Sequence, residues 1–156
     1  MTKELYLCIT IMLFTSCVEE STSVSYVFDN ESPVDIDIYT GDDYQTVDSS
    51  SVFPVKSGES RVFSSSYYRG IGEKPRILWP KIIAPMLVVW NKTDSVLYIA
   101  DSSTYTGTLK TIDTSSNRTL FRERNYETVL VTKKRNFHDF NLIYTFTEAD
   151  YEFAKQ

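Results

Sequence analysis

Hydrophobic and polar residues alternate with a period of two along much of the chain after residue 23. The clearest case is 34–39, where Val34, Ile36 and Ile38 face one way and two aspartates and a tyrosine face the other. Alternation of this kind is typical of a half-buried β-strand. Comparable short runs, separated by turn-forming residues, occupy 24–28, 52–55, 61–63, 76–79, 86–90, 95–100, 108–112, 126–133 and 137–147.

Two pairs of these runs predict hairpins. Residues 86–90 are continuously apolar, as expected of a central strand, and 95–100 return after a short polar loop. Residues 126–133 and 137–147 predict a second hairpin close to the end of the chain. Pro54 has no backbone N–H to donate, so its strand is expected at the edge of a sheet.

The pattern changes to a helical one only at the end of the chain. Thr147 followed three residues later by Asp150 has the spacing of a capping box, which predicts a short helix over 148–155. About eight short strands, one short helix and no alternation of strands with helices predict a single all-β domain. We expect an immunoglobulin-like β-sandwich, with a small β-barrel as the alternative.

The segment 64–81 is less regular and contains two glycines and two prolines. We expect a long loop here, and long loops inside compact domains are often functional. Tyr67, Tyr68 and Trp79 lie in it, and aromatic rings with polar tips are suited to bind a sugar ring. The alternative is that these three aromatic residues cover one end of the sheet.

The N-terminal segment has the layout of a secretory signal peptide. Lys3 precedes an apolar run over 5–14, and small residues come after it. Ten residues of helix are about 15 Å long, which is half of the hydrocarbon core of a bilayer. We therefore expect residues 1–16 to direct export and not to span the membrane.

The end of this segment, Phe14-Thr15-Ser16-Cys17, resembles the lipobox of bacterial lipoproteins, with Phe14 in place of the commoner leucine. The resemblance implies that the Cys17 sulfur carries a diacylglyceryl group, that cleavage occurs before Cys17, and that its new amino group is acylated. Several acyl chains are needed because a single one gives only marginal membrane binding. The alternative is an ordinary cysteine at the end of a leader.

Two further stretches resemble parts of small Bacteroidetes lipoproteins. Glu19 and Glu20, just after the cysteine, are similar to the acidic surface-export signal of those proteins, although they could also simply solvate the tether. Residues 144–154 resemble the C-terminal end of the same proteins, and this resemblance does not imply a particular activity. The resemblance implies a lipid-anchored protein of the bacterial outer membrane that faces the cell exterior.

Composition constrains the part of the chain after the signal. Cys8 lies in the removed segment and Cys17 in the anchor, so a domain over 24–156, joined by a tether over 17–23, would have no thiol and no disulfide. Its core must be apolar, and 11 Tyr, 9 Phe and 2 Trp supply much of it. A net charge of −5 argues against nucleic acid as a partner.

Candidate catalytic and metal-binding residues are few. His138 is the only histidine, and its neighbour Asp139 would point to the other face of a strand, so the two cannot form a catalytic pair. We expect no metal and no cofactor. A calcium loop counted from Asp35 fails, because its fifth position is Tyr39 and the glycine comes seventh. The remaining acidic residues in this part of the chain are Asp37, Asp42 and Asp43.

Asp94-Ser95-Val96 matches the short O-glycosylation pattern of Bacteroidetes, in which an aspartate precedes a serine or threonine and an apolar residue comes next. We expect Ser95 to lie in an accessible turn.

No nucleophile and base stand in a recognisable pattern, so we expect a non-enzymatic module that binds a glycan or an envelope protein, or that forms part of an envelope assembly. One alternative is an immunity or inhibitor lipoprotein, and a less favoured one is a hydrolase with an unrecognised carboxylate site.

Overall fold

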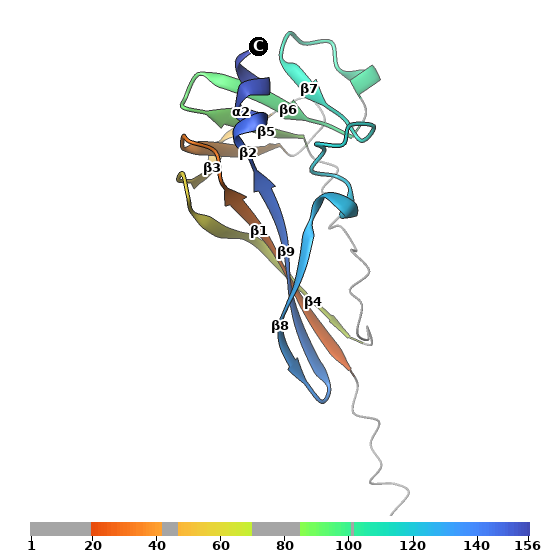
Figure 1. Ribbon diagram of the computed structural model, residues 1–156. Coiled ribbons are helices and arrows are strands. Elements are labelled where there is room, and N and C mark those ends of the chain that lie inside the picture. Colours follow the sequence, from red (N-terminus) through yellow and green to blue (C-terminus); the bar gives the residue numbers. More distant parts are fainter. Residues whose placement is uncertain (1–19, 42–46, 70–84, 101) are drawn as a thin grey trace, which may run out of the picture.

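The computed structural model describes residues 20–41, 47–69, 85–100 and 102–156, and these form two β-sheets and a C-terminal helix (Figure 1). The strands are β1 (Ser21–Asn30), β2 (Ile36–Gly41), β3 (Val47–Val55), β4 (Ser60–Arg69), β5 (Met86–Trp90), β6 (Asp94–Tyr98), β7 (Lys110–Ile112), β8 (Glu127–Lys134) and β9 (Phe137–Phe146). The helices are two 3-10 turns, η1 (Ser102–Thr104) and η2 (Glu123–Asn125), and the α-helix α2 (Glu148–Lys155).

The four-stranded sheet has the order β4-β1-β9-β8. Strand β1 pairs with β9 in the parallel sense over its full length from Ser21 to Asn30, and with β4 in the antiparallel sense from Ser21 to Asp29. Strands β8 and β9 form an antiparallel hairpin. The turn of this hairpin lies beside the start of β1, where the Ser21 N–H donates to the Asn136 carbonyl at 2.9 Å. Figure 1 places this end of the sheet opposite to α2 and the five-stranded sheet.

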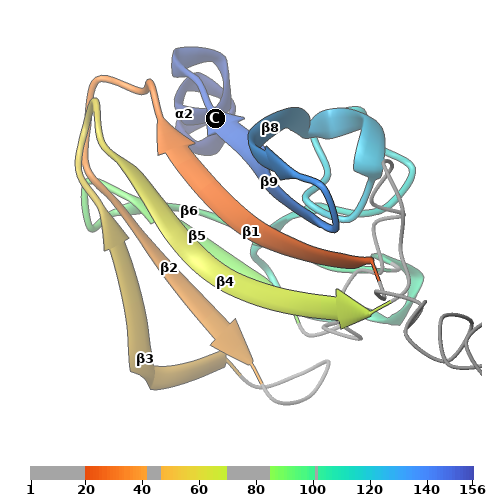
Figure 2. The ribbon, with the colours of Figure 1, turned by 90° about the horizontal axis from the view of Figure 1, so that it is seen from below.

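The five-stranded sheet has the order β3-β2-β5-β6-β7, with β6 and β7 parallel and the other pairs antiparallel. Asn91 and Lys92, between β5 and β6, have φ angles of 48° and 64°. Positive values at both positions are those of a type I′ turn, and the Thr93 N–H closes it by donating to the Trp90 carbonyl at 3.1 Å. Figure 2 shows β5 and β6 of this sheet behind β4 and β1, with β2 and β3 beside β4.

The core lies between the two layers and is rich in aromatic rings. Phe146 at the end of β9 is fully buried, and its ring centroid lies 4.9 Å from that of Tyr144, 5.6 Å from Phe28 and 6.1 Å from Trp90. These rings come from β1, β5 and β9, so one cluster joins both sheets. Alternate residues of β9 are buried, as its period of two predicts.

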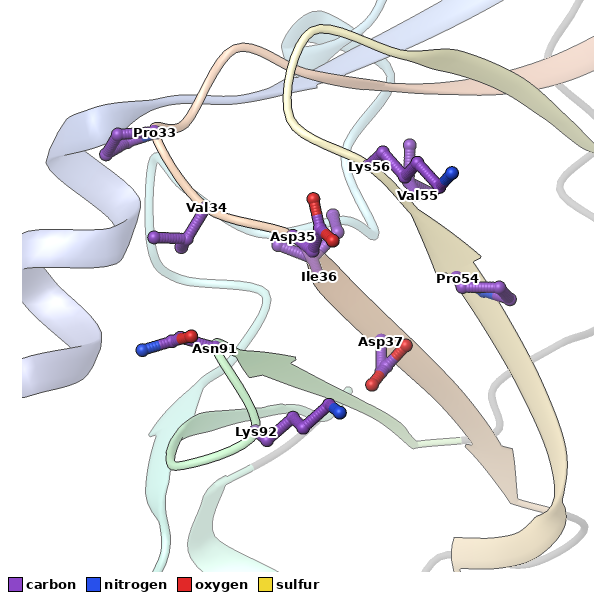
Figure 3. A pocket seen from close by; sticks show the side chains of 10 residues that line it. All are labelled: Pro33, Val34, Asp35, Ile36, Asp37, Pro54, Val55, Lys56, Asn91 and Lys92. Atoms are coloured by element: carbon purple, nitrogen blue, oxygen red, sulfur yellow. The ribbon is translucent and has the colours of Figure 1, made fainter.

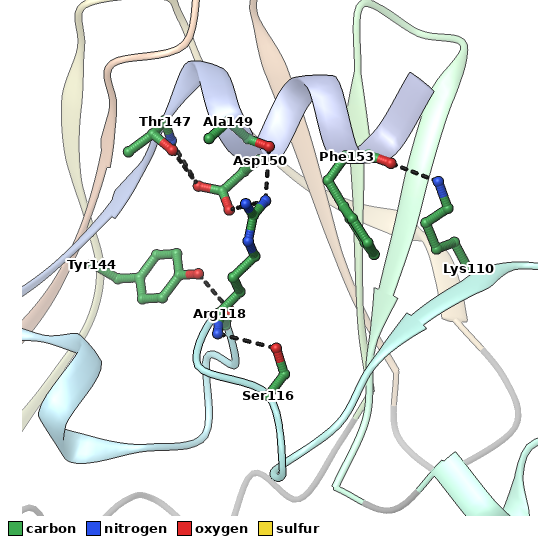
Figure 4. A network of polar contacts seen from close by, with 8 residues as sticks. All are labelled: Lys110, Ser116, Arg118, Tyr144, Thr147, Ala149, Asp150 and Phe153. Atoms are coloured by element: carbon green, nitrogen blue, oxygen red, sulfur yellow. Dashed lines mark hydrogen bonds and ion pairs between the residues drawn. The ribbon is translucent and has the colours of Figure 1, made fainter. Parts of the chain in front are cut away.

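Helix α2 begins at the predicted capping box (Figure 4). Asp150 Oδ2 accepts hydrogen bonds from the Thr147 N–H at 2.9 Å and from the Thr147 hydroxyl at 2.8 Å. The Arg118 guanidinium lies 3.4 Å from Asp150 Oδ1 and donates to the Ala149 carbonyl at 2.7 Å. The Tyr144 hydroxyl donates to the Arg118 carbonyl at 2.6 Å, so the loop before β8 and the end of β9 both hold the start of the helix.

The other end of α2 is held by Lys110 of β7. Its ammonium donates to the Phe153 carbonyl at 2.6 Å and lies 4.6 Å from the centroid of the Phe153 ring. A cation near the C-terminal end of a helix also interacts favourably with the helix dipole. Two contacts at opposite ends therefore fix a helix of only eight residues, which would be marginal in isolation.

The structure confirms an all-β sandwich with a short C-terminal helix, and its described strands form two sheets instead of a closed barrel. Nine strands are present in the described part of the chain, against about eight expected. Both hairpins are confirmed, as is the edge position of β3, the strand that contains Pro54. The strand expected at 76–79 lies outside the described residues.

Two boundaries were wrong. The loop expected from residue 64 begins later, because 64–69 continue β4 and pair with the start of β1. The domain expected to begin at residue 24 begins earlier, because β1 starts at Ser21. Both errors concern serine-rich stretches, whose weak strand propensity is overridden by pairing with a neighbouring strand.

Burial raises the pKa values of several tyrosines. The pKa of Tyr26 rises to about 12, mainly because the side chain is buried and secondly because Tyr68 is its neighbour. Burial is also the main reason why the pKa values of Tyr98, Tyr126 and Tyr144 lie well above the ordinary value. Each of these tyrosines has a higher pKa in the folded state than in the unfolded state, where the pKa is about 10. Its contribution to the stability of the protein is therefore fully present below about pH 10. That stabilisation is lost as the pH rises through the folded-state values.

We therefore expect cooperative alkaline unfolding above about pH 10, with a large part of the tyrosine ionisation occurring only as the protein unfolds. Circular dichroism and the ultraviolet absorbance of tyrosinate, followed together, measure both events. Tyr98→Phe should move the alkaline midpoint to higher pH, whereas Tyr67→Phe, at an exposed position, should leave it unchanged. Complete ionisation of all tyrosines in the folded protein would contradict this.

Candidate functional site

The outer face of the four-stranded sheet carries short polar side chains on its central strands. Residues of β1 with even numbers are buried, whereas Ser21, Ser23 and Ser25 point outward and are half-buried. Because β1 has a paired strand on each side, each outward serine lies in a row of side chains that crosses the sheet. Adjacent members of a row are separated by the strand spacing of about 4.8 Å.

One row contains an exposed aromatic ring. From β4 to β8, it consists of Tyr67, Ser23, Asp139 and Thr132, which are paired in register. The Tyr67 side chain is 61% exposed, whereas the other three are half-buried. An apolar ring therefore stands beside a line of hydroxyl and carboxylate groups.

The next row extends the polar surface. It consists of Ser65, Ser25, Asn141 and Val129. The hydroxyls of Ser25 and Ser65 are hydrogen-bonded to each other at 2.9 Å, so they are held in place. The two rows together offer hydroxyl, amide and carboxylate groups beside Tyr67.

Asp139 and His138 point to opposite faces of β9, as the sequence predicts. His138 is buried beside Phe140, with ring centroids 6.3 Å apart, and neither of its ring nitrogens has a hydrogen-bond partner among the described residues. Asp139 Oδ1 likewise has no partner within that part of the chain. This oxygen atom is itself buried from solvent, so it is not exposed to a ligand on the outer face.

The structure separates the aromatic residues that the sequence grouped in one loop. Tyr67 and Tyr68 are neighbours on β4, so Tyr67 points outward and Tyr68 packs against the core. The expectation of an adjacent pair in a loop was wrong, because of these two residues only Tyr67 lies on the outer surface. Trp79 lies outside the described residues.

Ser95 belongs to β6 and not to a turn, so this expectation was also wrong. The turn ends at Thr93, and Ser95 pairs with Val89 on β5. Its side chain is half-buried. A modifying enzyme would therefore meet this serine on a paired strand.

Within the described ranges, no group of three or more His, Cys, Asp and Glu residues is placed to hold a metal ion. Asp35 is exposed and Asp37 is half-buried, on the outer side of β2 and the loop before it. Asp42 and Asp43 lie outside the described residues, as do Cys17 and Glu19, while Glu20 is exposed just before β1. The described part of the chain contains no helix that is long and apolar enough to span a membrane.

A concave feature lies beside the five-stranded sheet. It is a pocket of about 380 Å³, formed by the loop before β2, the end of β3 and the turn between β5 and β6 (Figure 3). Sequence reasoning missed it because three distant segments form it. The only local signal was the turn-forming stretch Asn30-Glu31-Ser32-Pro33.

Comparison with family models, with curated proteins and with solved structures finds no match.

Proposed function

We propose that this protein is a lipid-anchored lipoprotein of the bacterial outer membrane that faces the cell exterior and binds a glycan without catalysing a reaction. The anchor is the lipidated Cys17, and Glu19 and Glu20 serve as the surface-export signal. The glycan lies on the outer face of the four-stranded sheet, with one sugar ring against Tyr67.

The lipobox resemblance and the chain geometry support the anchored part of this proposal. Strand β1 begins at Ser21, so only three residues separate it from Cys17. The domain would therefore be held close to the lipid surface by the end of the sheet that contains the turn between β8 and β9. The opposite end, with α2 and the five-stranded sheet, would point away from the membrane (Figure 1).

The exposed ring of Tyr67, in register with Ser23 and Asp139, is the observation that carries the glycan proposal. The C–H face of a sugar ring packs against an aromatic face, while its hydroxyls need donors and acceptors at the side. The outer face provides both within one row. The side chains stand on paired strands, so the surface is formed before the ligand arrives, which lowers the cost of binding.

Binding of the purified, lipidated protein in detergent micelles to an array of bacterial and host glycans tests this proposal. Tyr67→Ala should weaken the binding of a glycan found on the array about tenfold, the loss expected for one aromatic stacking contact. Tyr67→Phe keeps the ring and should retain most of the affinity. Val62→Ala, at another exposed position on β4, is the control for nonspecific effects.

A protein partner, as in an immunity or inhibitor lipoprotein, is the second candidate. Leu130 is 47% exposed and Val131 is 53% exposed, and both lie on the edge strand β8. Apolar residues on a sheet edge are suited to pair with another chain. A Leu130→Lys variant that loses a cell-surface protein partner, with glycan binding unchanged, would favour this alternative.

A further inference from the structure

The pocket beside the five-stranded sheet carries charges of both signs. Asp35 lies just before β2 and Asp37 within it, Lys56 follows the end of β3, and Lys92 lies in the turn between β5 and β6. In Figure 3, Asp37 and Lys92 lie on the same side of the pocket, below the exposed Asp35. At about 380 Å³, the pocket lies at the small end of the range for ligand sites.

The upper wall of this pocket is held by a buried asparagine. Asn30 is fully buried, and its amide group donates to the Val34 carbonyl at 2.9 Å and to the Val55 carbonyl at 3.1 Å. Its side-chain oxygen accepts hydrogen bonds from the N–H and the hydroxyl of Ser32, at 3.1 and 2.6 Å. One side chain thus fixes the loop before β2 against the end of β3.

Asp35 is the point at which the three segments of the pocket meet. Its carboxylate accepts a hydrogen bond from the Ser57 N–H at 2.9 Å, and its backbone carbonyl accepts one from the Asn91 N–H at 3.1 Å. The Ser57 hydroxyl donates to the Ser32 carbonyl at 2.7 Å. The walls of the pocket are therefore in place without a ligand, which reduces the ordering cost of binding.

The other three charged side chains that line the pocket are available to a ligand, as far as the described residues show. There, the side chains of Asp37, Lys56 and Lys92 form no ion pair and no hydrogen bond with other described residues. A ligand with a single charge would meet a like charge in this pocket, whereas a ligand with both charges can pair each of them. Pro33, Val34 and Pro54 add apolar side chains to the lining, on either side of the aspartates (Figure 3).

We propose that this pocket binds a short peptide with free termini, of two or three residues, as a zwitterion. The ammonium group of the ligand pairs with Asp37 and the exposed oxygen of Asp35, and its carboxylate pairs with Lys92 or Lys56. A small side chain of the peptide packs against the proline walls. This site lies on the other sheet from Tyr67 and does not depend on the proposed glycan site.

Titration of the isotope-labelled, lipidated protein in micelles with trialanine, followed by NMR, tests this inference. We expect saturable shifts at the backbone amides of the pocket, including those of Asp35 and Lys92. Acetylation of the N-terminus or amidation of the C-terminus of trialanine should each weaken binding at least fivefold, because each removes one charge. Equal binding of the doubly capped peptide, or no shift at the pocket, overturns the inference.

Charge variants of the protein complete the test. Asp37→Asn and Lys92→Gln should each weaken trialanine binding about five- to tenfold and leave the remaining spectrum unchanged. Glu31→Gln and Lys134→Gln, at exposed positions outside the pocket lining, are matched controls. Tyr67→Ala should leave trialanine binding unchanged, so failure of the glycan proposal and failure of this one are distinguishable. Unaltered affinity in both Asp37→Asn and Lys92→Gln refutes the site.

Discussion

Replacing Cys17 with alanine should move the protein from the membrane fraction to the soluble fraction of the cell. Each CH₂ group of an acyl chain that enters the bilayer contributes about 0.8 kcal/mol, so the loss of two or three chains removes the whole anchor. Fractionation of cells with ultracentrifugation, followed by immunodetection, measures the change. Metabolic labelling with a fatty-acid analogue should mark the unaltered protein and not the Cys17→Ala variant.

The chain provides a matched control for this experiment in its other cysteine. Cys8→Ala lies within the expected signal and should leave membrane fractionation and acyl labelling unchanged. Replacing Glu19 and Glu20 with alanine should preserve membrane attachment but protect the protein from protease added to intact cells. Unchanged membrane fractionation of Cys17→Ala would contradict the lipid anchor.

Replacing Phe146 with alanine should destabilise the domain by about 3–5 kcal/mol, because it leaves a cavity in a close-packed core. The ring is fully buried among Phe28, Trp90, Tyr98 and Tyr144, which belong to both sheets. Since domains of this size are stable by only about 5–15 kcal/mol, the loss is a large share of the total. Thermal unfolding followed by circular dichroism should show a midpoint lower by about 10 °C.

The control for this substitution removes an apolar side chain from the surface. Val62 is 56% exposed on β4, so Val62→Ala should change the free energy of unfolding by less than about 0.5 kcal/mol. Equal thermal midpoints for Phe146→Ala and the unaltered protein would show that the aromatic cluster does not join the two sheets energetically.

The sequence predicts best those elements whose pattern is local. Strand β2 alternates between buried and half-buried residues from Ile36 to Tyr39, β9 alternates over ten residues, and the capping box marks the start of α2. In each case the periodicity or the cap depends on residues that are close in the chain. These elements were located to within two residues for that reason.

The sequence could not predict the features that depend on distant pairing. Residues 64–66 are serines, and they form a strand because β1 pairs with them. The parallel pairing of β1 with β9 joins Ser21 to Phe137, and no local pattern indicates it. The outer rows and the pocket both result from such pairings, so neither candidate site could be assembled from the chain alone.

The pairing of β1 on both sides also determines how the protein would bear a mechanical load. With the anchor proposed at Cys17, pulling a bound ligand away from the cell would put the tether under tension. The tether would transmit this force to the start of β1, along the axis of the strand. Its hydrogen bonds to β4 and to β9 would then be loaded together in shear, because they run across the direction of the force. A strand held in this way cannot be peeled off one bond at a time, and the tether would extend fully before the domain begins to open.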